Sequence, residues 1–392
     1  MVKDWQSTTI GELLDFKNGL NKEKSFFGFG TPIVNYTDVY HHNGLHSDNI
    51  KGKVSLSKDE IRRFEVRKGD VFFTRTSETP DEVGISSVLL DEIQDCVFSG
   101  FILRGRPKTD KLLPEYCQYC FSSKKVRDEI IKHCTYTTRA LTNGKVLSAI
   151  DISIPEIDEQ RAIADAFACV EAHIANLTEL IEKKKAIRDG ALEDLVSGRT
   201  QLEGQTISWV DTELGELATY RKGNGSGTKD HYISTENINQ GFSDIQRYST
   251  KDAVEGCVFY ENDTLIANIR PYLRKVWYAE FSGICSLDVL ALQPKSAIDT
   301  KYLYYLVAND RFINYVMNGG VKGIKMPRGD KKFMLKYSVR IPSEKAIQTE
   351  LAQMITSMDN EVASLEEERD KIQQIKAGMI DDLLTGRVRL IG

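Results

Sequence analysis

The sequence predicts a tandem duplication of two mixed α/β (α+β) domains, each followed by one long helix. The first observation is a repeat, because residues 154–202 return near the C-terminus as residues 341–390. Beyond a one-residue insertion after the Ile-Pro, the copies match at a constant offset of 188, so that Gln160 corresponds to Gln348. The second observation is a coiled-coil spacing of apolar residues in both copies, and the third is a matched opening before each globular part.

Four parts follow from these observations. The globular parts are residues 1–153 and 207–340, and the long helices with their linker are residues 154–206 and 341–392. Each globular part is a mixed α/β unit of roughly 130–150 residues, which is a normal domain size.

The two globular parts are predicted to contain the same elements in the same order. Each opens on a tryptophan, Trp5 or Trp209, followed by a Gly-Glu-Leu sequence. Turn residues and apolar alternation then predict the following elements in pairs: extended runs at 31–40 and 231–240, strand-turn-strand hairpins at 68–90 and 261–281, aromatic helices at 112–131 and 299–317, and strands ending in Ile-Pro at 151–155 and 337–342.

Each repeated stretch is predicted to form a single helix, because it starts just after a proline and ends on Ser-Gly-Arg or Thr-Gly-Arg. From Asp158 to Val196 the first helix would be roughly 58 Å long. A helix with so narrow an apolar stripe needs a partner. Its duplicate is the nearest candidate, in either direction of pairing. The predicted seam consists of Ile163, Phe167, Val170, Ile174, Leu177, Ile181, Leu351, Ile355, Met358, Val362 and Leu365.

Composition is ordinary for a globular protein, with 41% hydrophobic and 28% charged residues among 392. No apolar run is long enough to span a bilayer, and the N-terminus lacks the pattern of a secretory signal. We therefore expect a cytoplasmic protein with no membrane partner. The seven cysteines are odd in number and scattered through apolar surroundings, which indicates reduced thiols.

The net charge of −5 is unevenly distributed. Residues 1–153 carry +1 and residues 207–340 carry +3, whereas residues 154–206 carry −5 and residues 341–392 carry −4. The acidic excess therefore lies on the predicted helices. A polyanion such as DNA is expected to meet the globular parts, whose surface fields depend on local clusters of charge.

A zinc site is suggested by Cys117 and Cys120, which are followed by a histidine and a cysteine at 133 and 134. The duplicate helix places Leu303 and Leu306 opposite the two cysteines. Apolar packing therefore explains them better, and we expect no metal.

No other catalytic constellation is recognised. His41, His42 and His46 have no counterpart in the second copy and are interpreted as surface residues. Glu129 and Asp81 do not form the convergent carboxylates that a nuclease metal requires, because Glu129 lies on a predicted amphipathic helix. No phosphate loop, cofactor fingerprint or nucleophile elbow is found. We expect no enzyme activity and no cofactor in this chain.

Framework residues give the chain a family resemblance. They include Ile154-Pro155 with Glu159-Gln160, Lys68-Gly69-Asp70-Val71, the Trp5 and Trp209 openings, and the pairs Leu195 with Gly198 and Leu383 with Gly386. With these residues in this order, the chain resembles the specificity subunit of type I restriction-modification systems over essentially its whole length. The second copy departs from the family pattern, since Ile347 stands where a glutamate usually precedes the glutamine, so its helix start is expected to be capped differently.

The resemblance implies two target-recognition domains, each reading one half of a split DNA sequence in the major groove. It also implies that the long helices pair antiparallel as a spacer and bind two methyltransferase subunits. Those subunits would supply the S-adenosylmethionine chemistry, and motor-nuclease restriction subunits would join for cleavage. S-adenosylmethionine, ATP and magnesium are thus expected on partner subunits, and double-stranded DNA is the expected ligand.

The basic, glycine-bearing turns of both domains contain the residue types that reach phosphates and base edges. The candidates for DNA contact are Asn18, Lys22, Lys24, Asn35, Tyr36, Thr74, Arg75, Ser77, Arg139, Asn143, Lys145, Arg221, Lys222, Asn224, Lys229, Asn237, Asn268, Arg270, Arg274, Lys322, Lys325 and Arg328. Three alternatives remain open at this point. One is a specificity module of another methylation or phage-defence complex, the second is a coiled-coil scaffold whose domains bind proteins, and the third is a nuclease in its own right.

Overall fold

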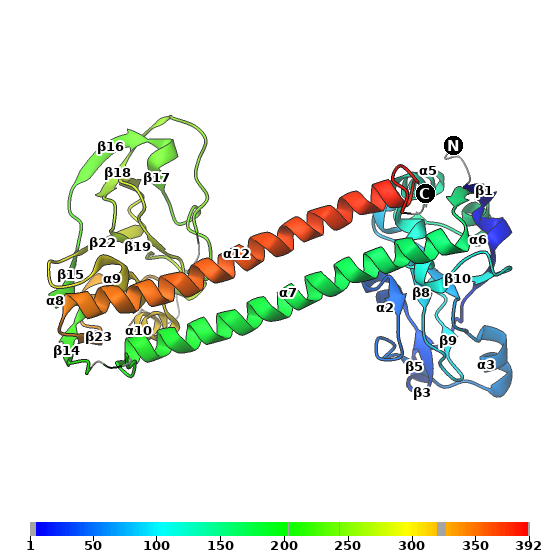
Figure 1. Ribbon diagram of the computed structural model, residues 1–392, viewed down its shortest axis with the longest axis horizontal. Coiled ribbons are helices and arrows are strands. Elements are labelled where there is room, and N and C mark those ends of the chain that lie inside the picture. Colours follow the sequence, from blue (N-terminus) through cyan, green and yellow to red (C-terminus); the bar gives the residue numbers. More distant parts are fainter. Residues whose placement is uncertain (1–4, 203, 205, 243, 320–326, 391–392) are drawn as a thin grey trace. The chain divides into compact units, whose positions relative to one another are not determined.

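The computed structural model describes residues 5–202, 204, 206–242, 244–319 and 327–390. The chain divides into two compact units (Figure 1). Unit 1 comprises Met1–Leu177 and Glu368–Gly392, and unit 2 comprises Thr178–Glu367. Each unit therefore contains one globular domain and one segment of each long helix.

Unit 1 is built on a five-stranded sheet in the order β2, β10, β6, β8, β4, in which only the β8–β4 pair is parallel. The bounds are β2 Leu14–Asn18, β10 Ile102–Pro107, β6 Val71–Thr74, β8 Ser86–Leu89 and β4 Gly44–Leu45. Unit 1 has three smaller sheets. One has the order β5 (Lys53–Val54), β3 (Phe27–Val34), β9 (Val97–Phe98), and another has the order β11 (Thr135–Tyr136), β12 (Ala140–Leu141), β7 (Thr76–Ser77). In the third, β1 (Gln6–Thr9) pairs with β13 (Asp151–Ile154).

The short helices of unit 1 lie between these strands. Three of them begin at capping boxes, Thr9 with Glu12, Asn35 with Asp38 and Ser57 with Glu60, which satisfy the first free N–H groups of each helix. Their bounds are α1 Ile10–Leu13, α2 Tyr36–His41, α3 Lys58–Phe64, α4 Pro114–Cys117, α5 Lys124–His133 and α6 Gly144–Ser148, with 3-10 turns η1 Lys24–Phe26, η2 Pro80–Glu82 and η3 Cys120–Ser122.

Unit 2 repeats this plan with a different second sheet. Its main sheet has the order β15 (Ala218–Tyr220), β22 (Val289–Pro294), β19 (Thr264–Ala267), β20 (Val276–Tyr278). The second sheet has the order β16 (Asn224–Thr228), β18 (Ala253–Phe259), β21 (Gly283–Cys285), β17 (Tyr232–Ile233), and β14 (Trp209–Glu213) pairs with β23 (Ser338–Pro342). The helices are α8 Leu214–Leu217, α9 Thr300–Val307, α10 Asp310–Gly319 and α11 Lys331–Leu335, with η4 Lys229–His231 and η5 Pro271–Leu273.

Both predicted hairpins are confirmed, since β6 pairs with β8 and β19 pairs with β20 in antiparallel registers. The extended run at 31–40 is only partly right. Strand β3 ends at Val34, and Asn35 then caps α2 in a capping box with Asp38. In the second copy only Tyr232–Ile233 of residues 231–240 is strand.

The two predicted aromatic helices are each broken, which corrects the sequence prediction. In unit 2 the cause is Asn309, which is buried between α9 and α10. Its Nδ2 donates to the carbonyls of Tyr305 and Leu306, both at 2.9 Å, and its Oδ1 accepts from the backbone N–H of Phe312 at 3.0 Å. One side chain therefore ends the first helix and caps the second. In unit 1 the break lies at η3, ahead of Ser123.

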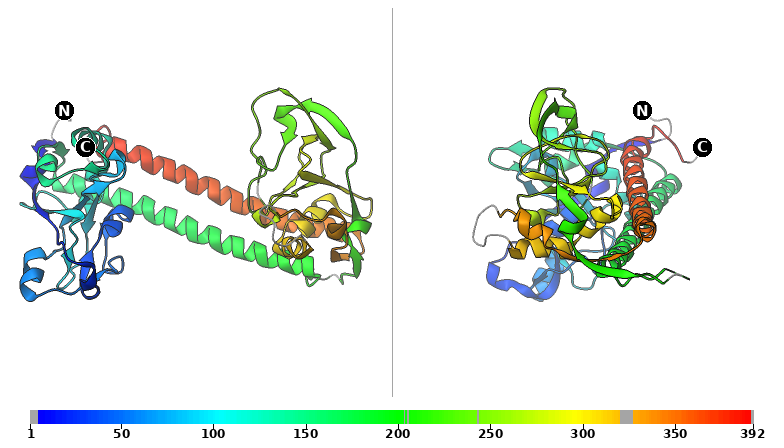
Figure 2. Two further views of the ribbon diagram at one scale, coloured as in Figure 1. Left: turned by 180° about the vertical axis from the view of Figure 1, so that it is seen from behind. Right: turned by 90° about the vertical axis from the view of Figure 1, so that its left-hand side faces the viewer.

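The long helices are α7 (Ile157–Ser197) and α12 (Lys345–Leu383). Within each unit their segments run antiparallel and lie side by side (Figure 2). In unit 1 Lys376, late in α12, is 2.7 Å from Glu171, in the first half of α7. In unit 2 Arg188, late in α7, is 2.7 Å from Asp359, early in α12. The antiparallel pairing implied by the resemblance is thus confirmed.

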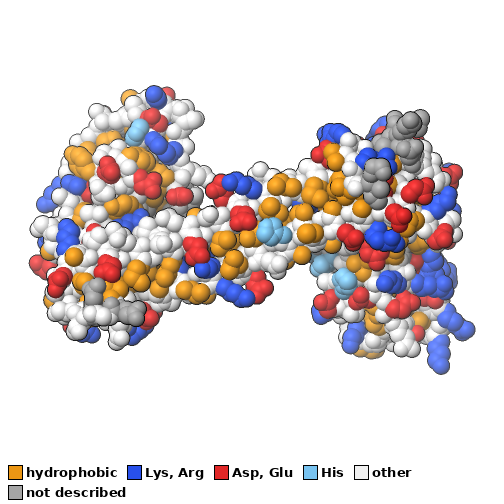
Figure 3. All heavy atoms as spheres, in the orientation of Figure 1, with side chains coloured by type: hydrophobic (Ala, Val, Ile, Leu, Met, Phe, Trp, Pro, Cys, Tyr) orange, Lys and Arg blue, Asp and Glu red, His pale blue; other side chains and the backbone are white. Residues whose placement is uncertain are grey.

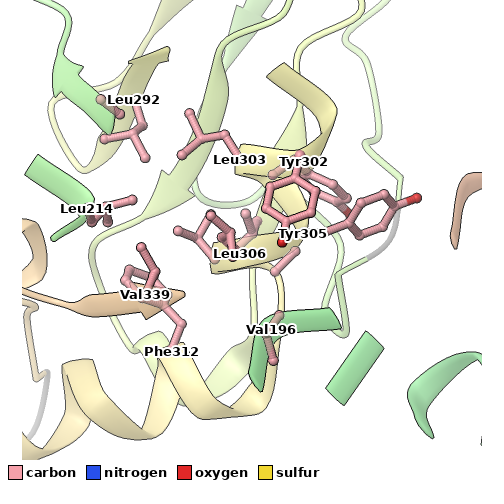
Figure 4. Close-up of a cluster of buried hydrophobic side chains, with 14 of the residues drawn as sticks. Val196, Leu214, Leu292, Tyr302, Leu303, Tyr305, Leu306, Phe312 and Val339 are labelled. Carbon is pink, nitrogen blue, oxygen red and sulfur yellow. The ribbon is translucent and has the colours of Figure 1, made fainter. Parts of the chain in front are cut away.

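The seam residues face inward, and the helix ends form part of each domain core. Seven of the eleven are buried and four are half-buried. In unit 1, Ile163 and Phe167 pack in the same cluster as Cys117 and Cys120. In unit 2, Val196 of α7 belongs to the same buried cluster as Leu303, Leu306 and Phe312, all of which are labelled in Figure 4. Burial of this apolar surface stabilises each helix segment against its own domain.

A buried glutamine links the start of each long helix to the loop that follows the main sheet. The Oε1 atom of Gln160 accepts the backbone N–H of Leu113 at 3.0 Å, and its Nε2 donates to the carbonyls of Lys111 and Pro155 at 2.7 and 2.9 Å. Gln348 makes the matching bonds in unit 2, to the N–H of Asp299 and to the carbonyls of residues 342 and 297.

Candidate nucleic-acid interface

In unit 1 three antiparallel strands present their ends at one edge of the main sheet. Asn18 at the end of β2 lies opposite Leu103 of β10, and Ile102 at the start of β10 lies opposite Thr74 at the end of β6. Because adjacent strands run in opposite directions, the segments after β2 and β6 meet the turn before β10. Arg75, the first residue after β6, therefore lies at this edge.

Helix α6 completes this edge. The Oδ1 atom of Asn143 caps the helix by accepting the N–H groups of Lys145 and Val146 at 3.0 and 3.1 Å, and the N–H of Thr142 donates to the carbonyl of Arg75 at 3.0 Å. The side chains around this junction line a depression of about 430 Å³. We use the name unit-1 edge for six of its polar lining residues, which are Lys17, Asn18, Arg75, Lys108, Asn143 and Lys145.

The same construction recurs in unit 2. The Oδ1 atom of Asp330 caps α11 by accepting the N–H groups of Lys332 and Phe333 at 2.8 and 3.0 Å. The N–H of Gly329 donates to the carbonyl of Asn268, the first residue after β19, at 3.2 Å. We call Arg221, Lys222, Asp330, Lys331 and Lys332 the unit-2 edge. Both edges carry an excess of positive charge, although their side chains differ.

Each main sheet contains a buried carboxylate paired with a guanidinium. Asp70, just before β6, accepts from Nε and Nη2 of Arg106 at 2.8 and 2.7 Å, and this pairing raises the pKa of Arg106. Asp263, just before β19, accepts from Nε and Nη2 of Arg221 at 2.8 and 3.0 Å. Arg221 is thus a predicted contact residue whose guanidinium already has a partner inside the protein.

Four of the predicted contact residues have buried side chains, namely Thr74, Ser77, Asn237 and Asn268. Thr74 donates to the carbonyl of Glu82 at 2.9 Å, and Ser77 donates to the carboxylate of the same residue at 2.6 Å. The amide of Asn237 donates to a neighbouring carbonyl at 2.7 Å. Burial removes these side chains from the surface, so the structure contradicts direct contact by them with a ligand.

The remaining candidates of unit 1 lie away from the edge. Lys22 is paired with Glu60, and this hydrogen bond, together with those from Ser57, lowers the pKa of Glu60 to about 2. Lys24 is exposed in η1, and Asn35 caps α2, whose Tyr36 stacks on Tyr40 with ring centroids 5.7 Å apart. Arg139 is exposed and lies 3.7 Å from the carboxylate of residue 78.

In unit 2 the other candidates occupy two loops and a strand. Asn224 starts β16, and the ammonium group of Lys229 lies over the ring of Tyr248 at 4.9 Å. Arg270 and Arg274 flank η5 in the left-handed backbone conformation, with φ of 52° and 54°. Arg274 is 2.6 Å from Asp310, and Arg328 is 3.0 Å from Asp288. Lys322 and Lys325 lie outside the described residues.

Sequence reasoning missed four lysines at these edges: Lys17, Lys108, Lys331 and Lys332. Lys17 precedes the predicted Asn18, and burial followed by repulsion from Arg104 and two other arginines lowers its pKa. Lys331 and Lys332 lie in the first turn of α11 and are exposed. The signal available was position, since each lies where an element ends or begins beside a predicted residue.

The residues considered above for a zinc or nuclease site have other surroundings in the structure. Cys117 and Cys120 lie in the apolar core of unit 1, and Glu129 is paired with Lys132 at 3.2 Å. His46 is 2.9 Å from Asp91. Within the described part of the chain, no group of three or more His, Cys, Asp or Glu side chains is arranged to hold a metal. No helix in that part is long and apolar enough to cross a membrane.

The fold and the two edges define a class of duplicated two-domain proteins in which each domain ends in a long helix. The family model of the type I restriction modification DNA specificity domain matches residues 2–186 and 207–377. The chain therefore belongs to this family.

Several relatives are similar to the chain. It is 27% identical to the type I restriction enzyme EcoKI specificity subunit of Escherichia coli K12, over 44% of this chain and 40% of that protein. It is 21% identical to the type I restriction enzyme MjaVIII specificity subunit of Methanocaldococcus jannaschii, over 69% of this chain and 70% of that protein. The fold is that of the type I restriction-modification S subunit from M. genitalium, with 16% identity, a TM-score of 0.57 and coverage of 97% and 96% of the two chains.

Proposed function

We propose that the chain is the non-catalytic DNA-recognition subunit of a type I restriction-modification complex, and that each domain reads one half of a bipartite double-stranded DNA target. The observation that carries this proposal is the pair of matched edges. The two units keep the same strand ends, helix cap and backbone bonds, yet Arg75 is replaced by Asn268 and Asn143 by Asp330. Two domains that read different half-sites need the same backbone framework with different side chains at the contact surface.

The chemistry of the edges suits DNA. An arginine such as Arg75 can donate two hydrogen bonds to the edge of a guanine, whereas lysines act mainly as point charges for phosphates. Lys145 and Lys332 lie in the first turn of α6 and of α11, and both side chains are exposed. Arg75 is therefore the first candidate for reading a base, and the lysines are candidates for positioning the phosphate backbone.

The helices are proposed to set the separation of the half-sites and to bind two methyltransferase subunits. Hydrophobic side chains are exposed along the helical segments in Figure 3. Ile187 on α7 and Ile375 on α12, which correspond at the offset of 188, have exposures of 59% and 54%. Two equivalent apolar positions in the duplicated framework fit two copies of one partner. In this proposal the partners carry S-adenosylmethionine, ATP and magnesium, and motor-nuclease subunits join for restriction.

The proposal is tested by co-expressing the chain with the methyltransferase subunit encoded beside it and mapping methylated adenines in the host genome by long-read sequencing. We expect one split motif with a fixed spacer. A complex that assembles yet methylates no split motif would contradict the proposal. DNA binding that is insensitive to salt would instead favour a protein-binding scaffold, because phosphate contacts make affinity fall as salt rises.

Residue roles are tested in the same complex with Arg75→Ala, Arg75→Lys and Arg270→Ala. Loss of a bidentate base contact should cost about 1–3 kcal/mol and relax one motif position, whereas loss of a phosphate contact should weaken all sequences alike. Arg62→Ala is the matched control, since Arg62 is exposed on α3 beside Asp59 and outside the edge. Unchanged affinity and unchanged motif for both Arg75 and Arg270 variants would remove them from the interface.

A further inference from the structure

Each edge includes a tight turn that precedes the second strand of the main sheet, which is β10 in unit 1 and β22 in unit 2. In unit 1 the N–H of Ile102 donates to the carbonyl of Ser99 at 3.2 Å, and in unit 2 the N–H of Val289 donates to the carbonyl of Ser286 at 3.0 Å. Ile102 and Val289 occupy the same place, because each pairs with the last residue of the adjacent strand. Residues 99–101 and 286–288 are therefore equivalent turns.

These turns carry the two most exposed large apolar side chains of the described chain. Phe101 is 66% exposed and Leu287 is 72% exposed. A single exposed apolar residue is normal on a protein surface and needs no explanation. Here the two largest exposures fall in the same three-residue turn of both units, although the apolar residue is second in one turn and third in the other. The coincidence is one of position, which points to a shared role.

The turns are joined to the edges and flanked by cations. The backbone carbonyl of Phe101 accepts the backbone N–H of Arg75 at 3.1 Å. The residue that carries the exposed ring is therefore hydrogen-bonded to the backbone of that arginine. In unit 2 the carbonyl of Asp288 accepts the N–H of Asn268 at 2.8 Å, and its carboxylate is 3.0 Å from Arg328. The turn that carries each exposed apolar group is therefore bonded to the first residue after the adjacent strand, which is Arg75 in unit 1 and Asn268 in unit 2.

We propose that Phe101 and Leu287 contact base pairs directly in the major groove, each packing against the C5 methyl group of a thymine in its own half-site. A lone apolar group at an edge with an excess of positive charge fits a ligand that is anionic outside and apolar within. The thymine methyl is the apolar group that the major groove offers. A protein partner would need a wider apolar patch than one side chain provides. This inference rests on the proposed function and deepens it, since it names specificity residues.

The test uses the chain co-expressed with its methyltransferase subunit, in variants Phe101→Ser, Leu287→Ser and Phe101→Leu. The matched controls are Phe29→Ser in unit 1 and Val210→Ser in unit 2, which remove exposed apolar side chains outside the edges. We expect Phe101→Ser to relax one half of the methylation motif and Leu287→Ser to relax the other, by on the order of tenfold at one T·A position each. Phe101→Leu should retain most of the preference, and both controls should leave the motif unchanged.

A second measurement isolates the methyl group. Uracil in place of thymine at the affected position should weaken binding of the unaltered complex by about the same factor as the serine variant. The two changes together should weaken it no further, because both remove one contact.

Three results would overturn the inference. They are an unchanged motif in both serine variants, equal weakening on all sequences, and loss of the methyltransferase subunit from the complex. In each of these cases a split motif made by the unaltered chain would leave the proposed function standing. Absence of any motif from the unaltered complex would overturn both.

Discussion

Replacing Gln160 by alanine should open the junction between α7 and the domain of unit 1. The side chain is 1% exposed and makes three hydrogen bonds, to Leu113, Lys111 and Pro155. Alanine would leave one buried N–H group and two buried carbonyls without these bonds. Each unpaired buried group costs about 1–3 kcal/mol, and water that enters the vacated space recovers part of that cost. We therefore expect the free energy of unfolding of unit 1 to fall by roughly 3–5 kcal/mol.

Hydrogen exchange measured on the complex with the methyltransferase subunit reports this change locally. In Gln160→Ala the amide of Leu113, which donates to the lost oxygen, should exchange faster, and the matching amide of Asp299 in unit 2 should not. Gln348→Ala should give the reverse result. Gln160→Glu keeps the shape and the acceptor but loses both donated bonds. The amide of Leu113 should therefore exchange in this variant at a rate between those of the unaltered chain and of Gln160→Ala. Unchanged protection of Leu113, with a loss of unfolding free energy below about 0.5 kcal/mol, would refute the reasoning.

Three further outcomes are expected. Asp263→Asn removes the charge that Arg221 is paired with, and chemical denaturation should show unit 2 destabilised by about 1–3 kcal/mol, because the half-buried guanidinium loses its counter-charge. Glu159→Gln should release the C-terminal segment bonded through Arg389, so limited proteolysis should trim that segment faster than in the unaltered chain. The pKa of Glu60 is lowered from 4.5 to about 2, so the stability it contributes is present above pH 4.5 and is lost as the pH falls toward 2; Glu60→Gln should lack this pH-dependent part in thermal unfolding.

The long helices and hairpins could be predicted because their signals repeat over many residues. The seam of α7 extends over five consecutive steps of four or three residues, and no local contact competes with it. Short elements were predicted less well, because one side chain decides them. Asn35 starts a helix where β-type residues suggested a continuing strand, and Asn309 divides a helix whose aromatic pattern is continuous. Such side chains act through local hydrogen bonds, and these bonds leave no periodic pattern of apolar residues in the sequence.

The candidate interface shows the same limit for single residues. The stretch 74–77 does not follow the alternation of a single strand, because β6 ends at Thr74 and β7 begins at Thr76. Thr74 and Ser77 point inward and bond to Glu82, whereas Arg75 lies at the edge. The sequence named loops that meet at these edges in the structure, but it could not assign which of their side chains face the surface. The lysines in β2 and in α11 were missed for a related reason, since their importance comes from strands and helix caps that meet only in the folded domain.

The buried carboxylates suggest why the edges are free to differ. Asp70 and Asp263 occupy the same position before equivalent strands, but their guanidinium partners come from different ones, Arg106 on β10 and Arg221 after β15. The framework therefore requires a counter-charge for the carboxylate, because an unpaired buried charge is strongly destabilising. The arginine that supplies this counter-charge can come from either of two positions in the sheet. With Arg106 in that role, the position that corresponds to Arg221 is occupied by Lys17 at the unit-1 edge. Two domains with the same interior can thus present different cations to a ligand, as recognition of two unlike half-sites demands.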